Sequence, residues 1–173
     1  MKKKIFLIIL IFTIIAVYKS SINQIIIPKT AIRLRVIPNS NDQMDLFMKE
    51  KVKRYLENNI YNLIEDINDI EEARIIIKNN IPIIDNNIKE LFNQNNYHLD
   101  YNIDYGYNYF PEKDYKGVKY KDGYYESLVI SIGSANGDNW WCVLFPNFCL
   151  IDKNNLTNHK SIIKETINKY SKK

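Results

Sequence analysis

Residues 139–149, which read N-W-W-C-V-L-F-P-N-F-C, constrain the fold more than any other part of this chain. The segment contains both tryptophans, both cysteines and two of the seven phenylalanines of the sequence. These residue types are rarely left in water, so the segment must form either a core strand pair or a contact surface. Trp140 and Trp141 are adjacent, and on a strand they would point to opposite faces, one toward the core and one outward.

The spacing of apolar residues predicts a strand followed by helices. Residues 32–37 alternate between arginine and branched apolar side chains, which is typical of a strand. From residue 42 to residue 64 the apolar residues recur every three or four positions, as in an amphipathic helix. Asp69, with Glu72 three positions later, predicts the start of a short helix that ends near residue 79. Pro82 in a first turn predicts a separate helix over 82–92.

The second half of the chain has the two-residue period of strands. Alternation predicts a strand over 97–105, and an irregular aromatic stretch follows over 106–116. Further strands are predicted over 126–132 and 139–145. This order predicts an α+β fold, with a mainly antiparallel sheet of about four strands, helices packed on one face, and an N-terminal signal or anchor helix.

The N-terminal segment has the layout of a secretory signal. Lys2, Lys3 and Lys4 precede an apolar run over 5–17. A helix of this length would span about 20 Å, against a hydrocarbon core of about 30 Å, so a signal is favoured over a stable membrane span. Cleavage stays open, because no small-residue cleavage motif follows the run. We expect a signal peptide or membrane anchor over 1–20, a linker over 21–31, a globular domain over 32–152, and a polar tail over 153–173 that could form a short helix.

The charge and length of the chain exclude some classes of function. Three of the charges in the net +4 lie on Lys2, Lys3 and Lys4. The globular part is therefore not basic enough to predict nucleic-acid binding. A length of 173 residues favours one domain.

Cys142 and Cys149 are candidates for a disulfide. They flank a turn at Pro146 and Asn147, and in a hairpin they would lie opposite each other. Export would place the two cysteines in a compartment that permits a disulfide. In the chain-entropy account, this disulfide would stabilise the fold by about 2.5 kcal/mol. The alternative is two buried free thiols that pack as small apolar residues.

The sequence predicts no metal site, no cofactor and no catalytic residues. Two cysteines fall short of a zinc set, and His98 and His159 show no ligand spacing. A cysteine hydrolase would need a histidine beside Cys142, and nothing in the sequence places His98 there. We therefore predict a protein that is not an enzyme. A cell-wall-active cysteine hydrolase and a carbohydrate-binding module using exposed aromatic residues are the alternatives.

Four blocks of the sequence resemble the stage II sporulation protein R family of endospore-forming bacteria. Residues 139–150 read N-W-W-C-V-L-F-P-N-F-C-L, where the family has N-W-W-C-V-L-F-P-P-L-C-F. Residues 33–40 read R-L-R-V-I-P-N-S and resemble R-L-H-V-I-A-N-S, with Arg35 at the usual His. Residues 109–113 are similar to Y-F-P-T-K, and residues 123–128 to G-E-Y-E-A-L. The blocks occur in order across 32–151.

The resemblance implies a signalling role and no catalytic residues. Members of the family are exported into the space between the forespore and mother-cell membranes. There they activate a membrane-embedded aspartic protease that processes the sigma-E precursor. We expect this protease as the partner, with membrane contact through the N-terminal segment if it is uncleaved. The expected contact residues are aromatic: Tyr109, Phe110, Trp140, Trp141, Phe145 and Phe148.

Overall fold

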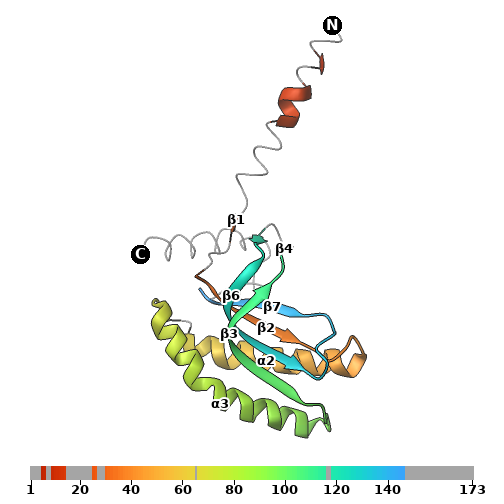
Figure 1. Cartoon of the computed structure of the whole chain (residues 1–173), viewed down its shortest axis with the longest axis vertical. Coiled ribbons are helices and arrows are strands. Elements are labelled where there is room, and N and C mark those ends of the chain that lie inside the picture. The colour runs from red at the N-terminus through yellow and green to blue at the C-terminus, as the bar shows by residue number, and fades with distance from the viewer. Residues whose placement is uncertain are drawn as a thin grey trace.

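A computed structural model describes residues 5–6, 9–14, 25–26, 30–64, 66–115 and 118–146 of the chain. Figure 1 shows its labelled elements. The long helices are α2 (Gln43–Ile64) and α3 (Ile70–Gln94). The strands are β1 (Ile25–Ile26), β2 (Ile32–Ile37), β3 (Tyr101–Phe110), β4 (Lys113–Tyr115), β5 (Val118–Tyr120), β6 (Gly123–Ile132) and β7 (Trp140–Phe145).

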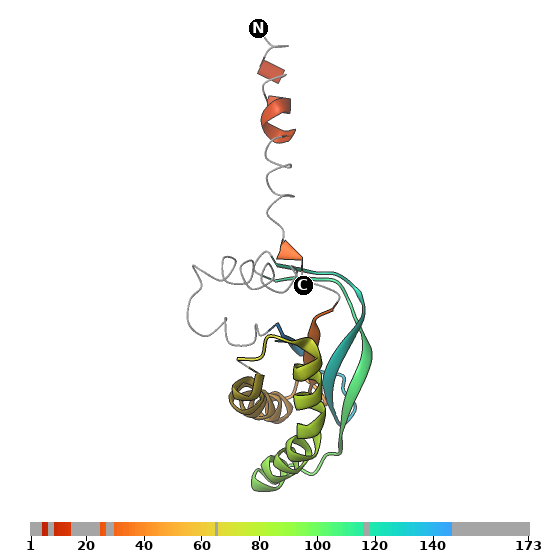
Figure 2. The ribbon, with the colours of Figure 1, turned by 90° about the vertical axis from the view of Figure 1, so that its left-hand side faces the viewer.

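The main sheet has four strands in the order β3-β6-β2-β7, and both long helices cover the same face of it (Figure 2). This confirms the predicted α+β class. The sheet is mixed, because β2 and β6 run parallel while the β3–β6 and β2–β7 pairs are antiparallel. The connection from β2 to β6 contains α2, α3, β3, β4 and β5, and a connection of that length lets two neighbouring strands run in the same direction.

The predicted break at Pro82 is wrong. Residues 70–94 form one continuous helix with Pro82 inside it. Proline at this position removes one backbone hydrogen bond. The buried apolar side chains before and after Pro82 nevertheless form one stripe on the same face of the helix. The predicted cap is present, since Asp69 Oδ1 accepts hydrogen bonds from the backbone N–H groups of Glu71 and Glu72. The buried side chains of the stripe are Ala73, Ile77, Ile84, Ile88 and Phe92.

The hydrophobic core lies between the helices and the sheet. Helix α2 contributes buried residues at four-residue spacing, namely Met48, Val52, Leu56, Ile60 and Ile64. The sheet contributes alternate residues of its strands, namely Ile32, Leu34, Val36, Leu128, Ile130, Ile132 and Leu144. Removal of these branched side chains from water supplies most of the drive for folding. Met44, Phe47 and Leu63, which share the helical spacing of α2, are exposed instead.

Strands β3 and β6 form one long hairpin. Their pairing runs without a register shift from Tyr101 opposite Ile132 to Phe110 opposite Gly123. The predicted strand over 97–105 therefore starts too early, and much of the stretch predicted as irregular is strand. Tyr97 precedes the strand because its ring packs edge-on against Phe92 and its hydroxyl group donates to buried Asp45. Beyond the main sheet, the hairpin continues as β4 and β5, and β1 pairs with β5.

Residues 5–6 and 9–14 are helical, and their large apolar side chains are exposed. Among the described residues, no helix combines the length and the apolar character needed to cross a bilayer. The predicted helix over 157–170 lies outside the described residues.

Two loops at one end of the sheet are held together by hydrogen bonds. The backbone N–H of Gly137 donates to the carbonyl oxygen of Pro38, and that of Ser134 donates to Asn39 Oδ1. Asn39 Nδ2 and Ser40 Oγ in turn donate to the carboxylate of Asp45 at 2.8 and 2.6 Å. These bonds tie the β6–β7 loop to the start of α2, and so fix where β7 begins.

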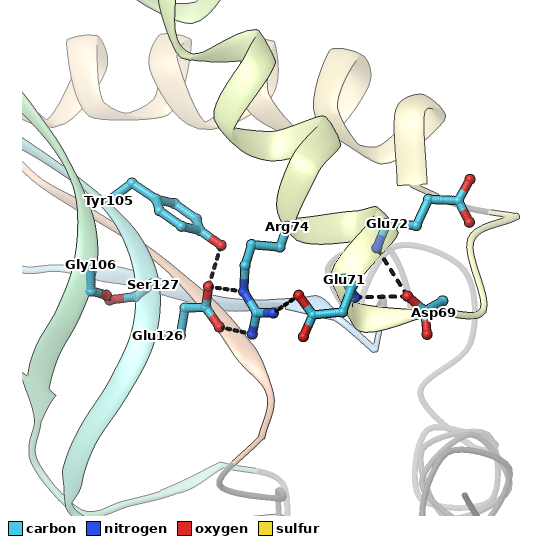
Figure 3. Close-up of polar contacts among 8 residues, drawn as sticks. All are labelled: Asp69, Glu71, Glu72, Arg74, Tyr105, Gly106, Glu126 and Ser127. Carbon is cyan, nitrogen blue, oxygen red and sulfur yellow. Dashed lines mark hydrogen bonds and ion pairs between the residues drawn. The ribbon is translucent and has the colours of Figure 1, made fainter.

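A second polar network joins α3 to the sheet (Figure 3). Arg74 binds Glu126 through two parallel hydrogen bonds, from Nε to Oε1 and from Nη2 to Oε2, each 2.7 Å long. The hydroxyl group of Tyr105 donates to the same carboxylate at 2.7 Å, and Arg74 also pairs with Glu71. The hydrogen bond from Arg74 holds the pKa of Glu126 below its ordinary value. Charge-assisted paired bonds of this kind are among the strongest in proteins.

The first prediction concerns the loop contact. In Gly137→Ala the added methyl group would overlap the backbone carbonyl of Ser40 and lie 2.7 Å from the Pro38 ring. We expect the free energy of unfolding to fall by about 1–3 kcal/mol, measured by urea denaturation. Gly106→Ala is the matched control, because its nearest contact would be an ordinary 3.8 Å from Asp104. Equal stability of the two variants would contradict the loop contact.

The second prediction concerns the pH dependence of stability. Because the pKa of Glu126 is lowered in the folded state, its contribution is complete above the ordinary value of 4.5. The contribution is lost as the pH falls through the folded-state pKa. Urea denaturation should therefore show a large stability difference between the wild type and Glu126→Gln at pH 7, and a much smaller one at acidic pH. Glu72→Gln, which removes an exposed carboxylate, is the control. A difference that stays constant with pH would argue against this ion pair.

Candidate functional site

The face of the sheet that is turned away from the helices is chemically different from the core face. Strand alternation places Arg33 and Arg35 of β2 there, whereas their neighbours Ile32, Leu34 and Val36 face the helices. Strands β3, β6 and β7 add aromatic side chains to this face, namely Phe110, Tyr125 and Trp141. We call this set of five residues the arginine–aromatic cluster.

The two guanidinium groups of the cluster lie against aromatic rings. Arg33 lies 3.4 Å from the centroid of the Tyr125 ring and 5.2 Å from that of Phe110. Arg35 lies 5.0 Å from the Phe110 centroid and 5.4 Å from that of Trp141. The Phe110 ring thus lies against both cations, and it meets Trp141 edge to face at 5.0 Å. Each such contact contributes roughly 0.5–2 kcal/mol, depending on how far it is removed from water.

A cavity of about 160 Å³ opens beside the cluster. Aromatic residues Phe110, Tyr120, Trp140 and Trp141 line it, together with the cations Arg33 and Lys113. Pro111, Asn139 and Cys142 complete the lining. The ammonium group of Lys113 lies 5.6 Å from the Trp141 ring centroid, which adds a second positive charge to the site.

Part of the hydrogen-bonding capacity of the arginines is unused. Arg33 is 2% exposed, and its Nε and Nη2 atoms have no hydrogen-bond partner. The buried Nε of Arg35 also lacks one. Burial lowers the pKa of both guanidinium groups below its ordinary value, but an arginine stays protonated at neutral pH. The site therefore contains buried positive charge with N–H donors that lack partners, and an anion is the type of ligand that would satisfy both.

Cys142, the nucleophile that a cysteine hydrolase would use, is not available as a thiol. Cys142 is disulfide-bonded, so its sulfur is not available as a thiolate. Cys149 lies outside the described residues, and its pairing with Cys142 stays a prediction. His98 is exposed, and His159 is also outside the described residues. Within the described ranges, no group of three or more metal-ligating side chains occurs.

A second group of aromatic residues lies on the other face of the hairpin. Tyr107, Tyr109 and Tyr124 are 72%, 50% and 70% exposed. Tyr109 and Tyr124 are cross-strand partners whose rings lie 5.7 Å apart. We call these three residues the tyrosine patch. The outer end of the β3–β6 hairpin therefore presents exposed tyrosines on one face, and on the other Phe110, which lines the cavity.

The structure brings together several of the residues predicted to contact a partner. Trp140 and Trp141 do lie on opposite faces, but both are half-buried: Trp140 packs against the core, and Trp141 joins the cluster. Phe110 is 0% exposed and lines the cavity, whereas Phe145 is 4% exposed and belongs to the hydrophobic core. Tyr109 is exposed, and Phe148 lies outside the described residues.

Arg33 and Arg35 are candidate site residues that the sequence alone did not predict. The available signal was the alternation itself, since arginine occupies every other position of a strand whose remaining positions are apolar. On an edge strand such arginines would be solvated. They form a site here because β2 lies in the interior of the sheet, where aromatic side chains of the neighbouring strands surround them.

The third prediction compares two arginines that receive the same substitution. Arg74→Met leaves the carboxylate of Glu126 buried without its partner, so the free energy of unfolding should fall by about 2–3 kcal/mol. Arg33→Met removes unpaired N–H donors and keeps an apolar side chain against Tyr125, so stability should stay the same or rise. Urea denaturation of both variants at pH 7 tests this contrast. A loss above about 2 kcal/mol in Arg33→Met would show that Arg33 is needed for folding.

Comparison with known proteins identifies the family. The family model described as stage II sporulation protein R matches residues 28–155. A curated relative, stage II sporulation protein R of Bacillus subtilis (strain 168), is 36% identical over 137 residues. That match covers 79% of this chain and 61% of the relative, so the chain spans about three-fifths of the length of that protein. No solved structure matches the chain significantly. The chain belongs to the stage II sporulation protein R family.

Proposed function

We propose that this chain is an exported signalling protein that activates a membrane-embedded aspartic protease by binding it. The protease would process the sigma-E precursor during endospore formation. The chain would act in the space between the forespore and mother-cell membranes, and it would not itself break bonds. Membership of a sporulation family and the signal-like N-terminal segment support this role.

The observation that carries the proposal is the outer end of the β3–β6 hairpin. It combines the exposed tyrosine patch with a cavity that is lined by aromatic and cationic side chains. Tyrosine, tryptophan and arginine are the residues that contribute most to protein–protein contacts. To activate an enzyme, such a contact must bind its active arrangement more tightly than its inactive one.

Two geometric observations disfavour the alternative functions. A cysteine hydrolase needs a free thiolate, and the sulfur of Cys142 is in a disulfide. A carbohydrate-binding module would stack a sugar ring on a flat aromatic platform. The rings of Tyr109 and Tyr124 meet at 63°, so the two do not form one together.

The fourth prediction tests the contact surface by co-expression with the candidate protease and its precursor in a non-sporulating host. Tyr109→Ser and Trp141→Ala should each lower precursor processing about tenfold or more, since a central interface aromatic contributes about 2 kcal/mol or more. Processing is measured as the ratio of mature to precursor sigma factor on an immunoblot. The melting temperature of each variant shows whether it is folded.

Phe47→Ser is the matched control, because Phe47 on α2 is 45% exposed, close to the exposure of Tyr109, and lies outside both aromatic groups. It should process the precursor at the wild-type level. A form that lacks residues 1–20 should be inactive although its domain folds, because it stays on the wrong side of the membrane. Wild-type processing by folded Tyr109→Ser and Trp141→Ala would refute the proposed contact.

A further inference from the structure

The free edge of the Arg33 guanidinium group has the geometry of a carboxylate-binding fork. Its Nε and Nη2 atoms are the two that lack hydrogen-bond partners. In an arginine side chain these nitrogens point two parallel N–H groups in one direction, at a spacing that matches the two oxygens of a carboxylate. The unused donors therefore form one bidentate edge.

The same protein contains a filled version of this arrangement. Arg74 uses its Nε and Nη2 atoms to hold both oxygens of Glu126, as Figure 3 shows. Arg33 has the same two atoms within a setting of aromatic rings, and neither atom has a hydrogen-bond partner. A buried donor without a partner costs roughly 1–3 kcal/mol, so a ligand that satisfies this edge would recover that free energy on binding.

The cavity next to Arg33 limits the size and character of the ligand. Its volume of about 160 Å³ is similar to that of a cavity that accommodates one benzene-sized group. The walls of Phe110, Tyr120 and Trp141 favour apolar atoms next to the charged group, and the ammonium group of Lys113 adds a second cation. Such a site fits a singly charged carboxylate on a peptide better than a free phosphate, which carries more charge and needs more donors.

We propose that Arg33 and the cavity bind a carboxylate of a partner polypeptide, either its C-terminal group or a Glu or Asp side chain. The inference rests on the proposed function for the identity of the partner, but the binding itself can be measured without the protease. The ligand would enter through the cavity, in whose wall Arg33 lies, and place its apolar atoms against the aromatic walls. Because the Nε and Nη2 atoms are buried in the structure, the Arg33 side chain would have to turn this edge toward the ligand for the two to pair.

Titration of the purified full-length chain in detergent with short peptides tests the proposal. Trp140 and Trp141 are the only tryptophans of the sequence and both line the cavity, so tryptophan fluorescence reports occupancy. The probes are acetyl-Ala-Ala-Phe with a free carboxylate, the same peptide as an amide, and acetyl-Ala-Glu-Phe-amide. Inorganic phosphate is the fourth probe.

We expect at least one carboxylate peptide to bind tenfold or more tighter than the neutral amide. If the free C-terminal peptide binds, the ligand is a chain terminus, and if the glutamate peptide binds, it is an acidic side chain. Arg33→Met should reduce binding to the level of the amide, while Arg33→Lys should retain only part of it because lysine cannot form the fork. Arg54→Met is the matched control, since Arg54 lies exposed on α2 and pairs with Glu50.

Several results would overturn the proposal. They are equal binding of the amide and the carboxylate peptides, no binding of any peptide up to about 10 mM, full binding by folded Arg33→Met, or tighter binding of phosphate than of either carboxylate. Any of these results would refute carboxylate binding by Arg33. If Trp141→Ala still lost precursor processing, the proposed function would stand without it. Carboxylate binding combined with wild-type processing in every contact variant would refute the proposed function instead.

Discussion

The structure depends on strand β2, whose two sets of alternate side chains serve different purposes. Ile32, Leu34 and Val36 pack against the helices, while Arg33 and Arg35 lie among aromatic rings on the opposite face. Because successive side chains of a strand point in opposite directions, one six-residue strand builds both the core and the candidate site. A register shift of one residue would place the arginines in the core, so the register that folds the protein also forms the site.

The neighbours of β2 determine what surrounds the arginines. Strand β6 pairs with it in parallel and supplies Tyr125, and β7 pairs in the antiparallel direction and supplies Trp141. Phe110 reaches the cluster from the far end of the hairpin, one strand further away. The bonds from Gly137 and Ser134 to the loop before α2 fix the start of β7, and thereby the position of both tryptophans.

The Arg33 and Arg74 sites differ in what they contribute. Arg74 is fully used: it binds Glu126 and Glu71 and joins α3 to the sheet. Arg33 stacks on Tyr125 but has two donors without partners, which lowers the net contribution of the burial to stability. Because Arg33 lies in the wall of the adjacent cavity, a ligand that pairs with these donors would remove this cost.

The sequence alone determined the α+β class, the family and the type of most long elements, because apolar periodicity and the residue blocks are local properties. It did not predict the continuous α3, since the burial of Ile84 and Ile88 on the same stripe as Ile77 outweighs the local effect of Pro82. It also placed β3 too early, because Tyr97 is held by Asp45, which is remote in the sequence. Only the tertiary structure decided that Arg33 and Arg35 form a site. Their role depends on strand order, and the rings and the cavity that surround them come from residues that meet only when the sheet assembles.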